Sequence, residues 1–231
     1  MLDFDRYAVL TFDCYGTLID WEAGILAALR PIAVAHGNRA DDATLLETYA
    51  TAEADAEAGP YLPYADVLRE AVVSVGDRLD FSPTAEEADA FAGSIGSWPA
   101  FPDSADALAR LGARFRLAAV TNCDDRLFAA SNQLLGEPFE WVITAQSVKA
   151  YKPSPRMFEA ALARIGQPAA RVLHVAQSLY HDHVPAQRLG ISTVWVNRRH
   201  SQPGAGATPK AEAQPDLEVP DMATLAELAG V

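Results

Sequence analysis

The amino-acid sequence predicts an α/β protein with a Rossmann-like core of parallel strands and an inserted all-helical cap. Short apolar runs that are typical of buried strands alternate along the chain with segments of helical periodicity. After the first of these runs, about eighty residues contain helical patterns only, which indicates an insertion. We therefore expect residues 1–20 and 101–231 to form the core and residues 21–100 to form the cap.

The first strand is expected at residues 7–12, an apolar and β-prone run that ends directly before Asp13. Gly16 then permits a sharp turn. Prolines and helix-start signals separate the helices that follow. The expected cap helices cover residues 25–35, 43–56, 64–75 and 84–94.

The alternation of strands and helices resumes beyond residue 101. The expected strands are 116–121, 141–144, 172–176, 193–196 and 217–219. The expected helices are 103–111, 126–135, 155–165, 185–189 and 222–228. Residues 201–214 are rich in Gly, Pro and Ala and are expected to form a surface loop.

Composition limits the classes of function. The formal net charge of −13 argues against a surface for nucleic acid or for an anionic membrane, because both need an excess of Lys and Arg. Two cysteines give no disulfide framework and suggest a reducing compartment. We see neither a signal peptide nor an apolar run of the ~18 residues that a membrane helix needs. The expected location is cytoplasmic.

Polar side chains follow several expected strands, at the edge where open α/β sheets bind ligands. Asp13 ends the first strand, and a desolvated carboxylate there can act as a nucleophile that forms an ester. Thr17 is a candidate hydrogen-bond partner of that carboxylate. Thr121 and Asn122 end the second strand, and Lys152 precedes Pro153, which favours an extended backbone that directs the lysine to the same edge.

In their order along the chain, these segments and residues 175–182 resemble the four motifs of the haloacid dehalogenase-like hydrolase superfamily. The resemblance is closest to the L-2-haloacid dehalogenase branch, because Tyr15 stands where phosphatases of the superfamily carry a second Asp. It implies that Asp13 is the nucleophile. The implied catalytic residues are Asp13, Lys152, Ser178 and Asp182, the last two positioning water. The expected substrate-binding residues are Tyr15, Thr17, Thr121 and Asn122, together with His183, which could take part in place of the missing cap Arg.

The leading hypothesis is a cofactor-free hydrolase of short 2-haloacids, which are small anionic substrates, and the resemblance also makes a homodimer an expectation. The first alternative is an Mg²⁺-dependent phosphatase. Its metal would meet a poor ligand set, because Ala176-Gln177 replaces the Gly-Asp of phosphatases. The second alternative is a non-catalytic protein that binds a small anion, and it is supported by the absence of an Arg in residues 48–57, where the dehalogenases carry one.

Two further expectations concern residues outside these motifs. The acidic run at residues 53–57 is expected to be a solvated helix face. His174, inside an expected strand, is assigned no functional role.

Overall fold

The computed structural model describes residues 2–200, 206–209 and 211–231. Six strands form one parallel sheet in the order β3-β2-β1-β4-β5-β6, which confirms the predicted fold class. The strands are β1 (Val9–Phe12), β2 (Arg116–Thr121), β3 (Trp141–Thr144), β4 (Val172–Ala176), β5 (Ser192–Val196) and β6 (Leu217–Val219). The central strands β1 and β4 are buried along their whole length, as expected for a sheet that is covered on both faces.

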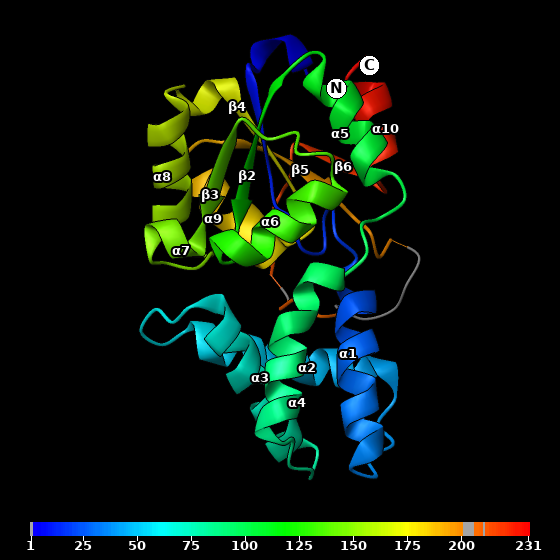
Figure 1. Ribbon diagram of the computed structural model, residues 1–231. Helices are drawn as coiled ribbons and strands as arrows, with labels where there is room; N and C mark the ends of the chain where they lie inside the picture. Colours follow the sequence, from blue (N-terminus) through cyan, green and yellow to red (C-terminus); the bar gives the residue numbers. More distant parts are fainter. Residues whose placement is uncertain (1, 201–205, 210) are drawn as a thin grey trace.

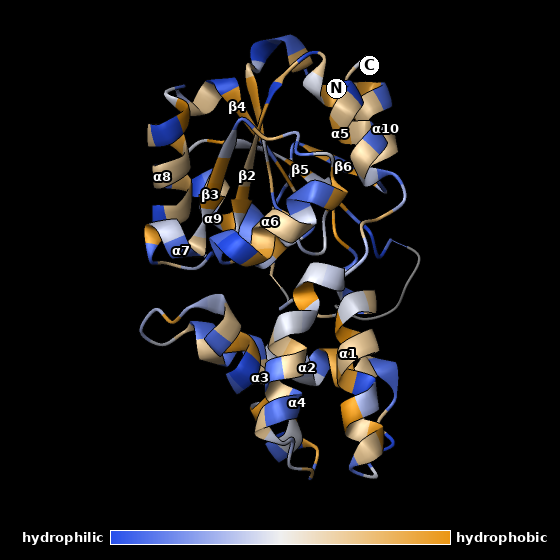
Figure 2. Cartoon of the chain, in the orientation of Figure 1, coloured by the Kyte–Doolittle hydropathy of each residue, from blue (hydrophilic) through white to orange (hydrophobic). Residues whose placement is uncertain are grey.

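Helices cover both faces of this sheet (Figure 1). On one face α5 (Ser104–Gly112) packs against α10 (Met222–Leu228), and on the other α8 (Arg156–Ile165) and α9 (Val184–Arg188) lie against the strands. The helices α6 (Asp125–Leu134) and α7 (Ala145–Val148) follow β2 and β3. Short 3₁₀ helices occur at Phe4–Arg6, Ser94–Ser97 and Ala169–Arg171, and a π-helix occurs at Leu179–His183. Figure 2 shows hydrophobic strands beneath helices of mixed character.

Four helices between β1 and β2 form a separate layer below the sheet (Figure 1): α1 (Trp21–Ala35), α2 (Asp42–Glu57), α3 (Tyr64–Arg78) and α4 (Ala85–Gly93). Side chains fix where they begin. Asp20 and Asp41 accept hydrogen bonds from the first turns of α1 and α2, and Thr84 forms a capping box with Glu87. Because Asp20 caps α1, this helix starts four residues earlier than its periodicity predicts.

Two chain segments connect the cap helices to the sheet, and they run beside each other. Ile19 forms an antiparallel bridge with Ala100, and the backbone amide of Asp20 donates to the carbonyl of Pro99 at 2.8 Å. Residues 21–100 contain no strand, whereas the division into domains at residues 20 and 100 stays a prediction.

The expected surface loop at residues 201–214 lies partly outside the described residues. Its described residues, 206–209 and 211–214, contain neither helix nor strand. Within the described ranges, no helix combines the length and apolar character needed to cross a membrane.

Candidate active site

The candidate site lies at the carboxyl ends of β2, β1 and β4. Phe12 is in register with Ala119 on one side and Val175 on the other, so the residues that follow these three strands meet at one edge. A pocket of about 410 Å³, its open mouth included, lies between this edge and the cap. Asp13 lines this pocket, so the fold places the predicted nucleophile at the boundary between the core and the cap.

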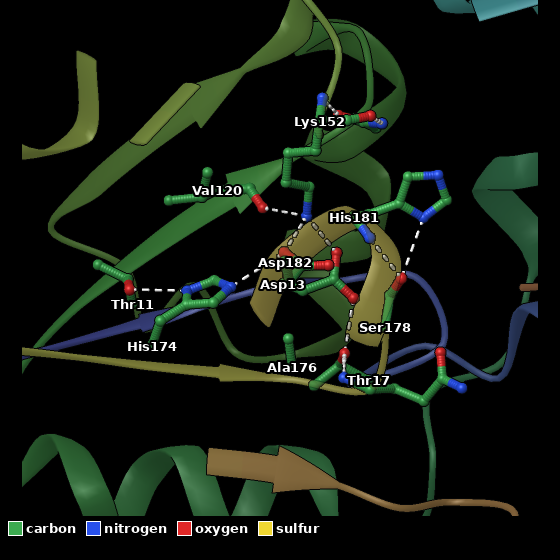
Figure 3. Close-up of polar contacts among 12 residues, drawn as sticks. Thr11, Asp13, Thr17, Val120, Lys152, His174, Ala176, Ser178, His181 and Asp182 are labelled. Atoms are coloured by element: carbon green, nitrogen blue, oxygen red, sulfur yellow. Dashed lines mark hydrogen bonds and ion pairs between the residues drawn. The ribbon is translucent and has the colours of Figure 1, made fainter. Parts of the chain in front are cut away.

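Lys152 connects the acidic groups of the site (Figure 3). Its ammonium donates to Asp13 Oδ1 at 2.7 Å, to Asp182 Oδ1 at 2.7 Å and to the carbonyl of Val120 at 2.9 Å. An ammonium has three hydrogens, so these contacts use all of them. Burial alone would lower the pKa of Lys152, but the two carboxylates outweigh it and raise the pKa. The lysine therefore stays charged in the buried site.

Asp13 is held at both carboxylate oxygens. Lys152 binds Oδ1, and the hydroxyl of Thr17 donates to Oδ2 at 2.6 Å. The backbone amide of Gln177 donates to the same Thr17 oxygen at 2.9 Å, which fixes the direction of the hydroxyl proton. Burial, together with the charge of Asp182, raises the pKa of Asp13, and Lys152 and Thr17 partly offset this. The result is a desolvated, oriented carboxylate.

Asp182 reaches this network from the π-helix. Its Oδ1 also lies 2.9 Å from His174 Nε2, and His174 Nδ1 lies 2.8 Å from the hydroxyl of Thr11. Burial raises the pKa of Asp182, but Lys152 and His174 reverse this and hold the pKa well below its usual range. Asp182 Oδ2 is buried and has no partner among the described residues.

His174 was therefore missed as a supporting residue. Thr11 on β1 and His174 on β4 are paired in register. Thr11 lies two residues before Asp13, and His174 lies two residues before Ala176, at the end of β4. Two polar residues at matched positions of apolar strands were the signal that could have identified the pair.

The structure brings most of the other predicted residues to the pocket or directly behind it. Asn122 holds the backbone of Lys152, accepting from its amide at 2.7 Å and donating to its carbonyl at 3.0 Å. The hydroxyl of Tyr15 lies 3.0 Å from Ser131 Oγ, and the Tyr15 ring forms part of the pocket wall. Ser178 Oγ lies 3.1 Å from His181 Nδ1 and accepts from the His181 amide at 2.9 Å.

Three predicted substrate contacts, Thr17, Thr121 and His183, do not line the pocket, and Thr17 instead binds Asp13 from within the core. Thr121 is fully buried, and its hydroxyl has no partner among the described residues. His183 is also fully buried, and its Nε2 donates to the carbonyl of Ala176 at 3.0 Å. The π-helix turns His183 toward the sheet while it turns Asp182 toward Lys152, which the sequence pattern did not indicate.

The expectation of a solvated acidic face on α2 is wrong. Glu53 is 5% exposed, and its Oε1 accepts hydrogen bonds from Tyr49 at 2.8 Å and Tyr64 at 2.6 Å. Glu57, four residues later, lies on the same face, half-buried and 3.3 Å from Asn122 Nδ2. Asp55 points outward to Arg78. Burial raises the pKa of both glutamates, and for Glu57 the charge of Glu53 adds to the effect.

The residues at the expected magnesium position do not fit that ion. Asp182 Oδ1 is occupied by Lys152 and His174, and neutral Gln177 accepts at Oε1 from Thr208 at 3.1 Å. Mg²⁺ is usually bound through one or two carboxylates, and of the Asp13 and Asp182 oxygens only Asp182 Oδ2 has no partner among the described residues. Within the described residues, no group of three or more His, Cys, Asp or Glu side chains is arranged to hold a metal.

A comparison with protein families identifies this architecture. The model of the haloacid dehalogenase-like hydrolase family matches residues 7–182, which include the nucleophile position and the π-helix. The chain belongs to this family. A second model, described as HAD-hydrolase-like, matches residues 150–225. Together with the haloacid dehalogenase relatives, this membership supports a hydrolytic enzyme.

Individual relatives include both dehalogenases and phosphatases. The first two curated relatives align over less than half of their own length, 45% and 46%. An (S)-2-haloacid dehalogenase of Pseudomonas putida is 25% identical over 94% of this chain and 93% of that protein. A phosphoserine phosphatase of Thermus thermophilus is 30% identical over 85% of this chain and 77% of that protein. An L-2-haloacid dehalogenase structure from Xanthobacter autotrophicus has a TM-score of 0.82 at 22% identity, covering 97% of this chain and 98% of that one, and shows the shared fold.

Proposed function

We propose that the chain hydrolyses the carbon–halogen bond of a small 2-halogenated substrate through an ester of Asp13, without a metal ion. The observation that carries the proposal is the environment of Asp13. A buried lysine and a threonine hydroxyl hold its two oxygens, and Tyr15 replaces the second acid of a phosphatase site. The dehalogenase relative of Pseudomonas putida supports the same reaction class.

In the first step, an oxygen of Asp13 attacks the carbon that bears the halogen. The carbon–oxygen bond forms as the carbon–halogen bond breaks, and the halide leaves with the bonding electrons. Desolvation makes the carboxylate a stronger nucleophile, and the two hydrogen bonds aim it. Lys152 compensates the charge that Asp182 keeps beside the reacting group.

In the second step, water attacks the ester carbonyl carbon of Asp13 and releases the alcohol, so the overall reaction consumes one water and produces halide and a proton. Ser178 and His181 line the pocket and are joined by a 3.1 Å hydrogen bond. Burial lowers the pKa of His181 to about 4, so its imidazole is neutral at physiological pH and accepts the proton of the attacking water through Ser178. Asp182 holds Lys152 in place.

The test is halide release from chloroacetate, 2-chloropropionate and 2-chloroacetamide in the presence of a chelator. Wild type is compared with Asp13→Asn and with Asp55→Asn, which makes the same change on the outward face of α2. Release that is lost in Asp13→Asn and retained in Asp55→Asn is the expected result. Release of phosphate from a phosphomonoester that needs Mg²⁺, with no halide release, would establish the phosphatase alternative instead.

The finer features of the sequence prediction stay predictions. These are the cytoplasmic location, the homodimer and the anionic charge of the substrate. The ammonium of Lys152, the one cationic side chain in the described lining of the pocket, makes its three hydrogen bonds within the protein, which does not favour an anionic substrate.

A further inference from the structure

We propose that Glu53 and Glu57 make the pocket selective for a substrate whose group beside the halogenated carbon is an N–H donor, an amide or an amine, rather than a carboxylate. The inference rests on the proposed carbon–halogen hydrolysis and names the substrate class of the same site. It assigns to the cap a specificity-determining pair on one face of α2.

The first argument is the charge of the pocket. Its described lining contains four carboxyl groups, from Asp13, Glu53, Glu57 and Asp182, and one ammonium, from Lys152. That ammonium makes its three hydrogen bonds within the core. A substrate carboxylate would therefore enter a site in which four carboxyl groups surround one ammonium that already makes its three hydrogen bonds, which is unfavourable. Protonation of one carboxyl group would reduce the negative charge but would supply no cation.

The second argument is that acceptors in the pocket are left over. Both tyrosine hydroxyls donate to Glu53 Oε1, and no described residue donates to Glu53 Oε2. Glu57 has only the long 3.3 Å contacts from Asn122. Asp182 Oδ2 is buried without a partner in the described part of the chain. Unsatisfied acceptors are complementary to a ligand that brings N–H donors.

The third argument is that the other polar side chains of the lining are neutral. Trp21, at the start of α1, and Gln177, directly after β4, both line the pocket. Their N–H groups suit a carbonyl oxygen, and aromatic rings beside carboxylates also suit an ammonium group. A primary amide presents a carbonyl and two N–H donors and matches both sides of the pocket.

The test compares 2-chloroacetamide with chloroacetate, which have the same size and differ in NH₂ against O⁻. Halide release gives kcat/KM for each, and Asp13→Asn provides the background from spontaneous alkylation. That background is small because Cys14 and Cys123 are buried and burial raises the pKa of both thiols. We expect wild type to prefer the amide by about tenfold or more.

The variants Glu53→Gln and Glu57→Gln keep the shape and remove the charge. Each is expected to shift the ratio of kcat/KM values toward chloroacetate by about tenfold, whereas Asp55→Asn leaves the ratio unchanged. A ratio measured on one preparation does not depend on the folded fraction.

Three different results would each contradict a different claim: the substrate preference, the role of the two glutamates, or the proposed hydrolysis. A wild-type preference for chloroacetate overturns this inference and leaves the proposed function intact. Wild type could prefer the amide while Asp55→Asn changes the ratio of kcat/KM values as much as Glu53→Gln and Glu57→Gln do. That result would exclude a specific role of Glu53 and Glu57. No halide from either substrate overturns the proposed function itself.

Discussion

Replacement of Lys152 by Met removes the cation of the site while keeping much of the side-chain volume. Asp13 Oδ1 and Asp182 Oδ1 each lie 2.7 Å from Lys152 Nζ, so they are at most about 5.4 Å apart. Two unit charges at that distance repel by about 3 kcal/mol at an effective dielectric constant of ~20. This agrees with the ~3–5 kcal/mol lost when one partner of a buried pair is removed.

This repulsion predicts losses of both stability and turnover. Urea denaturation should show a free energy of unfolding that is lower by about 3 kcal/mol for Lys152→Met. The same repulsion raises the pKa shared by the two carboxyl groups, and Asp13 also loses the hydrogen bond that aims its Oδ1. A misaimed nucleophile typically costs about a hundredfold, so turnover at neutral pH should fall by about that factor. The double variant with Asp182→Asn removes the repulsion and should recover stability without recovering activity. A single variant with wild-type stability, or with turnover within twofold of wild type, would refute the reasoning.

Three further predictions concern the metal, pH and packing. EDTA should leave halide release unchanged, and Mg²⁺ should not raise the melting temperature; a requirement for Mg²⁺ would contradict the site geometry. Burial lowers the pKa of His183 from 6.5 to about 4, so its neutral form is favoured in the fold, and stability should decline by about 3 kcal/mol as pH falls from 6.5 to 4. Urea unfolding of His183→Gln across this range should show a shallower decline, and an unchanged slope would exclude His183 as the cause. Gly24→Ala should destabilise by about 1–3 kcal/mol, because its Cβ would lie 2.2 Å from Trp98, whereas Gly93→Ala, with open space around it, should not.

Much of the fold follows from local patterns in the sequence. The strand runs are apolar and short, and the cap helices have strong start signals such as the capping box at Thr84. The order of the motifs along the chain indicates the superfamily, and the structure brings Lys152 into contact with Asp13 and Asp182, two residues that the resemblance implies are catalytic. Their catalytic roles stay predictions.

Other features depend on tertiary contacts that local patterns do not encode. The π-helix decides that Asp182 faces the site and His183 faces the sheet, although both are polar residues in one short segment. The inward face of α2 is acidic because Tyr49 and Tyr64 supply hydroxyl donors to Glu53, and one of these donors comes from the next helix. An acidic run normally indicates a solvated surface, so only the packing of α2 against α3 reveals this face.

The central claim is that Asp13 forms a covalent ester, and a single turnover in ¹⁸O-labelled water tests it most directly. Enzyme in excess over the best halide-releasing substrate is digested, and the peptide that contains Asp13 is analysed by mass spectrometry together with the product. Water that attacks the ester carbonyl leaves ¹⁸O in the Asp13 carboxyl and transfers an unlabelled oxygen to the alcohol. Label in Asp13 and none in the product is the predicted result. Label in the product and none in Asp13 would show direct attack of water on the substrate and would contradict the account.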